Sequence, residues 1–205
     1  MRSYIKKLCL LLIVILFTGC AVTSPNVNYY TLSPLASVEP VRSEDEPVSI
    51  AIGPIDLPNY LQRNQIVTRK NHRLKINEYH RWGASFESSI LNTLGENIRQ
   101  LVNSSHIVIY PSLPRFSIDY RFVFDVVQFE GVLGDEAVLN VRWLVLDGKG
   151  KHALTVEHTK LIQPLEGRSY DALVEAYSAL LSQLSQEMAK AIVELESQAS
   201  ANRAT

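Results

Sequence analysis

The sequence predicts a single α/β domain in which a mixed, largely antiparallel sheet is covered by two long amphipathic helices. Two segments, about 84–103 and 173–195, carry apolar residues at helical spacings of three and four. Several other segments are rich in β-branched and aromatic residues and are bounded by Gly, Pro or Asn, as strands are. The 205-residue chain, less its first 19 residues, suits one domain with a sizeable core.

The first 20 residues predict a lipoprotein signal peptide rather than a membrane span. Between Leu8 and Gly19 the apolar run holds about 11 residues, whereas a helix needs about 20 to cross the hydrocarbon. A basic start, a short apolar core and a small residue at Gly19 are typical of a secretory signal. The stretch FTGC, residues 17–20, resembles the lipobox of bacterial lipoproteins, so we expect cleavage before Cys20. The alternative is an ordinary signal peptide with an incidental cysteine.

Cysteine usage supports acylation of Cys20. The only other cysteine, Cys9, lies in the segment to be removed, so the mature chain would hold one cysteine and no internal disulfide. A diacylglycerol and an N-acyl chain on Cys20 would account for this residue and give stable anchoring. No other cofactor is expected. Removal of three basic residues leaves 17 basic and 21 acidic ones, which argues against a nucleic-acid partner.

The N-terminal half of the mature chain predicts strands. Residues 28–33, NYYTLS, form an early strand, and the Pro- and acid-rich residues 34–47 form a solvated linker. The nearly continuous apolarity of 48–55 predicts a strand buried on both faces, inside a sheet. Residues 65–69 and 73–77 flank Lys70-Asn71-His72 and predict a hairpin.

The helix at 84–103 is followed by a strand at 106–110, which Pro111 and Pro114 end. Three long strands, 116–129, 136–147 and 151–162, then predict an antiparallel meander. In the first of them Ile118, Tyr120, Phe122, Phe124 and Val126 share one face. Ser169 is expected to cap the second helix, with Asp171 in its first turn.

The predicted organisation has four parts. Residues 1–19 are the signal peptide, and 20–47 are a lipid-anchored segment with the early strand and the linker. Residues 48–197 are the folded domain, and 198–205 are a flexible C-terminal tail.

The sequence offers no support for an enzyme or a metal site. A nucleophile motif of the G-x-S-x-G type and a Gly-rich phosphate loop are both missing from the sequence. His152 and His158 share strand parity but would lie roughly 20 Å apart, too far to bind one metal ion. The adjacent acids Asp135 and Glu136 are interpreted as a solvated turn.

The segment 52–69, IGPIDLPNYLQRNQIVTR, is the most distinctive stretch of the chain. A strand ending in Gly-Pro is followed by an L-P-x-Y-L-x-R turn and a second strand. With further motifs in order along the chain, this stretch resembles the PqiC-type family of ABC-transport auxiliary lipoproteins. The motifs are YYTLSP at 29–34, LPNYLQR at 57–63, QIV at 65–67, Trp82 before the helix, Phe129-x-Gly131 and Trp143.

The resemblance implies an outer-membrane, non-catalytic component of an ABC-type or MCE-type system that moves lipid or another hydrophobic molecule across the periplasm. It also implies a ring-forming collar, hence a homo-oligomer, whose partner is a periplasmic MCE-type tunnel protein or an ABC transporter. Ala21 rather than Asp after the cysteine fits the usual sorting rule for the outer membrane.

A second interpretation is a lipid-anchored periplasmic binding protein or assembly chaperone that holds a hydrophobic ligand itself. A collar needs self-complementary patches, whereas a binding protein needs an internal pocket.

The turn at 57–63 is the candidate interaction site. Pro58 fixes its own backbone angle and biases Leu57 towards extended structure, so the turn has a defined shape. Tyr60 and Arg63 are residue types enriched at protein interfaces. The alternative is that Leu57, Tyr60 and Leu61 close the core beneath a loop. Trp82 and Trp143 are expected in the core.

Overall fold

The computed structural model describes residues 25–42, 47–112 and 116–203. The proposed signal peptide and Cys20 therefore lie outside the described residues. The elements are β1 (Asn28–Tyr30), β2 (Ile50–Asp56), the 3-10 helix η1 (Asn59–Leu61), β3 (Gln65–Lys70), β4 (Arg73–Trp82), α2 (Phe86–Leu101), β5 (Ile107–Ile109), β6 (Tyr120–Gly131), β7 (Glu136–Asp147), β8 (Ala153–Pro164) and α3 (Tyr170–Arg203).

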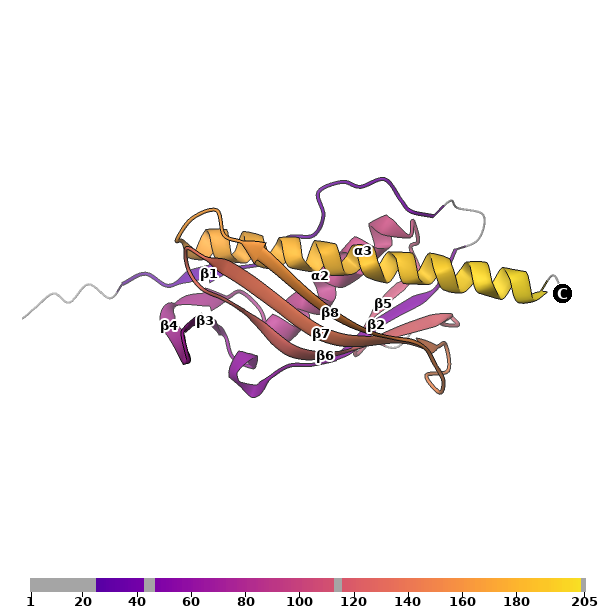
Figure 1. The fold of residues 1–205 in the computed structure, drawn as a ribbon, viewed down its shortest axis with the longest axis horizontal. Helices are drawn as coiled ribbons and strands as arrows, with labels where there is room; N and C mark the ends of the chain where they lie inside the picture. Colours follow the sequence, from indigo (N-terminus) through magenta and orange to yellow (C-terminus); the bar gives the residue numbers. More distant parts are fainter. Residues whose placement is uncertain (1–24, 43–46, 113–115, 204–205) are drawn as a thin grey trace, which may run out of the picture.

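A five-stranded mixed sheet in the order β5-β2-β6-β7-β8 forms the body of the domain (Figure 1). The inner position of β2 confirms the prediction from its apolar run, because β2 pairs in parallel with both β5 and β6. The meander prediction is also confirmed, since β6, β7 and β8 pair antiparallel along their lengths. These features give the α/β fold expected from the sequence.

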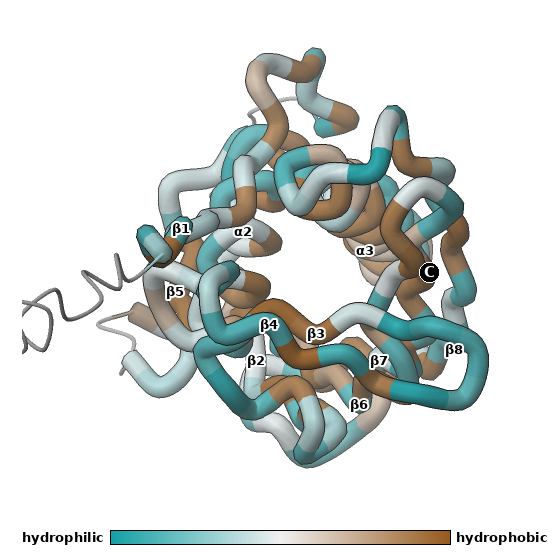
Figure 2. Tube along the Cα trace, turned by 90° about the vertical axis from the view of Figure 1, so that its left-hand side faces the viewer, coloured by the Kyte–Doolittle hydropathy of each residue, from teal (hydrophilic) through white to brown (hydrophobic). Residues whose placement is uncertain are grey.

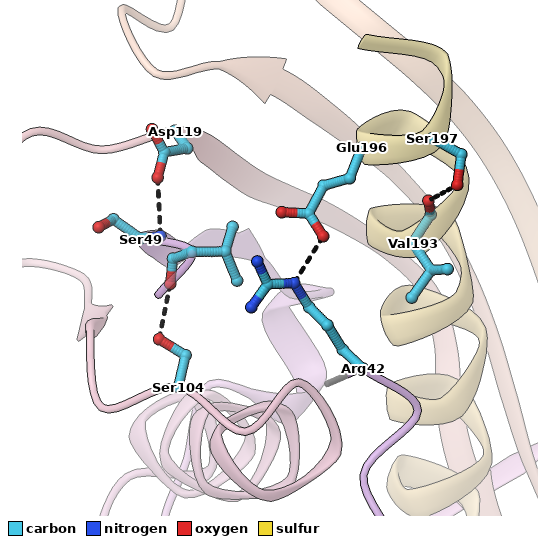
Figure 3. A network of polar contacts seen from close by, with 8 residues as sticks. Arg42, Ser49, Ser104, Asp119, Val193, Glu196 and Ser197 are labelled. Atoms are coloured by element: carbon cyan, nitrogen blue, oxygen red, sulfur yellow. Dashed lines mark hydrogen bonds and ion pairs between the residues drawn. The ribbon is translucent and has the colours of Figure 1, made fainter. Parts of the chain in front are cut away.

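The first meander strand begins later than predicted. Residues 116–119 precede β6, which starts at Tyr120. The Asp119 carboxylate accepts a hydrogen bond of 2.8 Å from the Ser49 backbone N–H, at the entry to β2 (Figure 3). The Asp119 side chain therefore holds the segment before β6 against the start of β2.

Helices α2 and α3 pack on one face of this sheet, and their apolar stripes fill the core. Ser85 caps α2 by accepting a hydrogen bond from the Ser88 N–H, and Ser169 accepts one from the Ala172 N–H at the start of α3. Trp82 and Trp143 are buried, as predicted. A Cβ built on Gly131 would lie 2.5 Å from a Leu173 methyl group, so only glycine allows α3 to approach β6 this closely.

The strands near the N-terminus form a separate sheet in the order β1-β4-β3. The predicted hairpin is confirmed: β3 and β4 are antiparallel, and Asn71 in the turn adopts a positive φ of 56° that suits asparagine. β1 is shorter than predicted and pairs in parallel with the end of β4. Figure 2, which looks onto one end of the molecule, shows β3 and β4 lying across that end.

The segment expected to be a solvated linker packs on the helices in its described part. The Leu35 N–H donates to the Asn97 side-chain oxygen at 2.8 Å, and the Val41 N–H donates to the Leu101 carbonyl at 2.8 Å. Arg42 forms an ion pair of 2.7 Å with Glu196 on α3 (Figure 3). Residues 34–42 are exposed or partly exposed and form no helix or strand, as expected of a linker, but hydrogen bonds between α2 and their backbone hold them against the domain.

The C-terminal boundary also differs from the prediction. Helix α3 continues to Arg203, so residues 198–203 are helical rather than part of a flexible tail. The apolar stripe ends near Leu195, and helix-forming residues then extend the helix into solvent. No helix in the described part of the chain is long and apolar enough to cross a membrane.

Candidate interaction surface

The turn 57–63 is partly core and partly surface. Leu57 and Leu61 are buried, at 5% and 4% exposure, and join the core cluster. The Gln62 side chain donates a 2.8 Å hydrogen bond to the Leu57 carbonyl, which closes the turn around η1. Pro58 is partly exposed, and Arg63 is exposed. Each interpretation of this turn thus fits some of its residues. Leu57 and Leu61 close the core, whereas Pro58 and Arg63 are accessible to a partner.

Tyr60 points inward to a polar cluster instead of standing free on the surface. Its ring packs against the core, and its hydroxyl lies near Glu130 of β6 and Arg69 of β3. Burial, followed by the negative charge of Glu130, raises the pKa of Tyr60 to about 12. Tyr60 is therefore a neutral hydrogen-bonding group at physiological pH. Its position ties the turn to the two sheets.

The centre of this cluster is the ion pair between Arg69 and Glu130. The Glu130 side chain is only 2% exposed, and the Arg69 side chain is 34% exposed. The same Glu130 oxygen accepts a 3.0 Å hydrogen bond from Gln128, while its other oxygen is buried without a hydrogen-bond partner among the described residues. The hydrogen bond to Glu130 raises the pKa of Arg69.

Sequence reasoning missed this pair. Glu130 stands between Phe129 and Gly131, both buried, so an acid inside an apolar run was the available signal. Its partner lies 61 positions earlier in the chain, and nothing in the spacing of residues links the two. Tyr177 of α3 is buried beside Phe129, at a ring separation of 4.7 Å, and burial raises its pKa, followed by the charge of Glu130. The cluster thus joins β3, β6, η1 and α3.

A groove of about 200 Å³ runs beside the exposed part of the turn. It lies between the turn and the first residues of α2. The lining residues are Leu57, Leu61, Gln62, Arg63, Asn64, Ser85, Phe86 and Glu87. Arg63 and Glu87 give this groove one cationic and one anionic side chain, a composition that suits a polar peptide contact rather than an apolar ligand.

The described residues give no sign of metal or covalent chemistry. Among them, no group of three or more His, Cys, Asp or Glu side chains is placed to hold a metal ion. His158 binds the Asn140 side chain at 2.6 Å, and His152 binds Asp147 at 2.9 Å. The two histidines therefore bind different side chains, His158 within β8 and His152 in the turn between β7 and β8.

The class of protein is an α/β domain with two helices on one face of a mixed five-stranded sheet. Two solved structures share this fold. One is protein XCC0632 from Xanthomonas campestris, of the family DUF330, with 13% identity and a TM-score of 0.69 over 85% of this chain and 99% of the other. The second is an uncharacterized protein with 19% identity and a TM-score of 0.62, over 82% and 99% of the two chains. At these identities the likeness establishes the fold alone.

A family model described as the ABC-type transport auxiliary lipoprotein component matches residues 30–189. The protein therefore belongs to this family, as the motifs in its sequence predicted. Membership makes it a lipoprotein component associated with an ABC-type transport system, and the family is described as an auxiliary component of that transport. No match was found among curated protein sequences.

Proposed function

We propose that this protein is an outer-membrane lipoprotein, acylated on Cys20, that serves as a docking or collar subunit of an ABC-type or MCE-type intermembrane transport system. The cargo would be a lipid or another hydrophobic molecule, and the energy would come from the inner-membrane partner. The family match over most of the chain is the observation that carries this proposal. The protein would act as a homo-oligomer that receives a periplasmic tunnel protein, and it would catalyse no reaction itself.

The packing of the domain supports a docking role over the alternative of a ligand-holding protein. The space between the helices and the sheet is filled by buried side chains such as Phe122, Phe129 and Tyr177. A larger groove, of about 540 Å³, is open at the surface and is lined by polar groups including His80 and Asp171. A protein that encloses a lipid needs a deep apolar cavity. An open groove with polar side chains in its lining suits contact with a partner better than storage of a lipid.

The anchor is tested by Cys20→Ser in the full chain. Loss of the lipid should release the protein from the outer-membrane fraction, because no helix of the described residues can span a membrane. Mass spectrometry of the N-terminal peptide of the wild type should show the added mass of a diacylglycerol and an acyl chain. A Cys20→Ser protein that stays with the outer membrane would refute the anchor.

The docking role is tested in a deletion strain scored for sensitivity to membrane-active compounds. Arg63→Glu should fail to restore resistance while leaving the melting transition unchanged, because Arg63 is exposed beside the groove. Arg168→Glu, another exposed arginine, is the matched control and should restore resistance. Full rescue by both Arg63→Glu and Cys20→Ser would exclude docking and favour the binding-protein alternative. Copurification of a stoichiometric lipid with the protein would favour that alternative as well.

A further inference from the structure

The β3–β4 hairpin concentrates positive charge in a protein whose expected mature charge is negative. Between Arg63 and Asn77 the sequence holds five Lys or Arg residues, one histidine and no acid. Arg69 is neutralised by Glu130, but Lys70, Arg73 and Lys75 are exposed, and no ion pair joins them to a carboxylate within the described residues. The hairpin turn therefore presents cations that the fold itself does not use.

The register of the hairpin sorts its side chains by face. Lys70 pairs with Arg73 and Thr68 pairs with Lys75, so the unneutralised cations share one face near the turn. The pairs on the other face include Leu74 and Ile76, whose side chains are 38% and 43% exposed. A hairpin with cations on one face and exposed aliphatic groups on the opposite face suits the boundary between lipid headgroups and acyl chains when its turn approaches the bilayer end-on.

The hairpin lies at the end of the molecule where the N-terminal chain emerges. Figure 1 shows β3, β4 and the first described residues at the same end, and β1 pairs with the end of β4. Four residues separate Cys20 from Pro25, and the five steps between these two Cα atoms can span at most about 18 Å. An acylated Cys20 would therefore hold this end of the domain close to the bilayer.

The opposite end of the molecule provides a control for this contact. The β7–β8 turn, 148–150, lies at that end in Figure 1. Helix α3 runs along the long axis between the two ends, and its 34 residues span about 51 Å. Lys149 and Lys151 are exposed there. Because headgroup attraction falls off within about 10 Å at moderate salt, lysines at this end lie beyond its reach.

We infer that the β3–β4 hairpin binds the anionic phospholipid headgroups of the membrane that holds the anchor. The hairpin turn approaches the bilayer end-on: Lys70, Arg73 and Lys75 on one face contact phosphate groups, and Leu74 and Ile76 on the opposite face enter the interface. The inference rests on the proposed acylation of Cys20. The contact would orient the domain. The anchor tethers it to the membrane at one point, and the hairpin supplies a second contact at the same end. The long axis then points away from the bilayer, with the β7–β8 end towards the periplasmic partner.

The test uses the mature acylated protein, reconstituted into vesicles of phosphatidylcholine alone or of phosphatidylcholine mixed with phosphatidylglycerol. A fluorescent label is attached at His72→Cys in the hairpin turn, or at Lys149→Cys as the control, and its quenching by aqueous iodide is measured. At low salt the label at 72 should be shielded in the phosphatidylglycerol vesicles only, and the label at 149 should be accessible in both. High salt should abolish the shielding at 72, because screening weakens the attraction of the cations to the headgroups, and shielding that persists at high salt would contradict the inference. Inorganic phosphate added to the phosphatidylcholine vesicles should not shield the label.

Charge variants make the test specific. The double change Lys70→Gln and Lys75→Gln should weaken docking about five-fold for each lysine removed, so that shielding at 72 is largely lost. The matched double change Lys149→Gln and Lys151→Gln should leave it intact. Equal accessibility at 72 and 149, or equal loss of shielding in both double variants, would overturn the inference.

Two other outcomes separate this inference from the proposed function. Shielding at 72 that does not depend on phosphatidylglycerol, as a contact with a second copy would give, overturns the headgroup contact and leaves the anchor standing. A protein that neither floats with the vesicles nor carries acyl mass overturns the anchor and, with it, the inference.

Discussion

Among the described residues, two arginine–carboxylate pairs join one strand to another, and they differ in burial. Arg69 and Glu130 join the small sheet to the main one, with the Glu130 side chain 2% exposed. Arg142 and Asp125 lie opposite each other on the solvent face of the main sheet, 63% and 49% exposed, at 2.5 Å. Both pairs lie within ion-pair distance, so distance alone would assign them similar contributions to stability. Burial decides which one matters, because a buried carboxylate without its partner has no water to stabilise it.

The buried pair also has a location that the exposed pair lacks. It lies beneath the turn that carries Tyr60 and fixes the end of β3 next to the hairpin turn that we place on the membrane. The exposed pair links two strands that already share a full antiparallel ladder. The first pair therefore positions one sheet on another, whereas the second adds little to a contact already made.

The largest expected effect is from Arg69→Ala. It should lower the free energy of unfolding by about 3 kcal/mol, because it leaves the buried Glu130 carboxylate without its cation. Arg142→Ala should cost less than about 1 kcal/mol, because Asp125 stays in contact with water. Urea denaturation of the purified lipoprotein, followed by the fluorescence of Trp82 and Trp143, measures both. Similar losses in the two variants would mean that burial does not distinguish the pairs.

A smaller difference is expected when the charge is kept and the shape is changed. Arg69→Lys should cost about 1–2 kcal/mol, because a lysine cannot present the planar guanidinium that reaches Glu130 from β3. Arg142→Lys should change stability by no more than about 0.5 kcal/mol. The same denaturation experiment decides this, and a neutral Arg69→Lys would show that charge alone holds the hairpin.

The turn offers a third comparison, between an inward and an outward side chain. Tyr60→Phe should lower the free energy of unfolding by about 1 kcal/mol, because the hydroxyl lies in the cluster around Glu130. Arg63→Ala should leave the unfolding transition within about 0.5 kcal/mol of the wild type and weaken assembly instead. Size-exclusion chromatography measures the oligomeric state of each variant. Loss of assembly in Tyr60→Phe but not in Arg63→Ala would reverse the assignment.

The smallest effect is expected at alkaline pH. The pKa of Tyr60 is raised from 10.0 to about 12, so the folded protein keeps this proton where the unfolded chain has lost it. That contribution to stability is complete below pH 10 and is lost as the pH rises towards 12. Tyr60→Phe should therefore show a shallower decline in stability over this range. Parallel declines in the two proteins would indicate that Tyr60 titrates normally.

Much of the fold could be predicted from local patterns. The helix α2, the inner strand β2, the meander and the β3–β4 hairpin follow from periodicity, apolar runs and turn residues, each of which acts within a few positions of the chain. The capping roles of Ser169 and the burial of both tryptophans were also predicted. The family resemblance of the motifs was confirmed by the match over 30–189.

Several features that the sequence did not reveal involve partners distant in the chain. The described part of the linker is mostly exposed, as expected, yet Asn97 and Leu101 of α2 bind its backbone. Glu130 was passed over because its cation comes from another sheet. For the turn, the sequence left open whether Tyr60 faces a partner with Arg63 or closes the core, and the structure turns Tyr60 inward and leaves Arg63 exposed. Sequence spacing carries no information about such contacts.

The sequence by itself determined the class of the fold, the predicted acylation site at Cys20 and the family, because these depend on local composition and on the order of short motifs. Only the tertiary structure decided which charges are neutralised and which are left exposed. Arg69 and Lys70 are neighbours in the chain, yet β3 aims Arg69 at the buried Glu130 and Lys70 at solvent. Alternation along a strand sends adjacent side chains to opposite faces, and the packing of one sheet on another determines what each face meets.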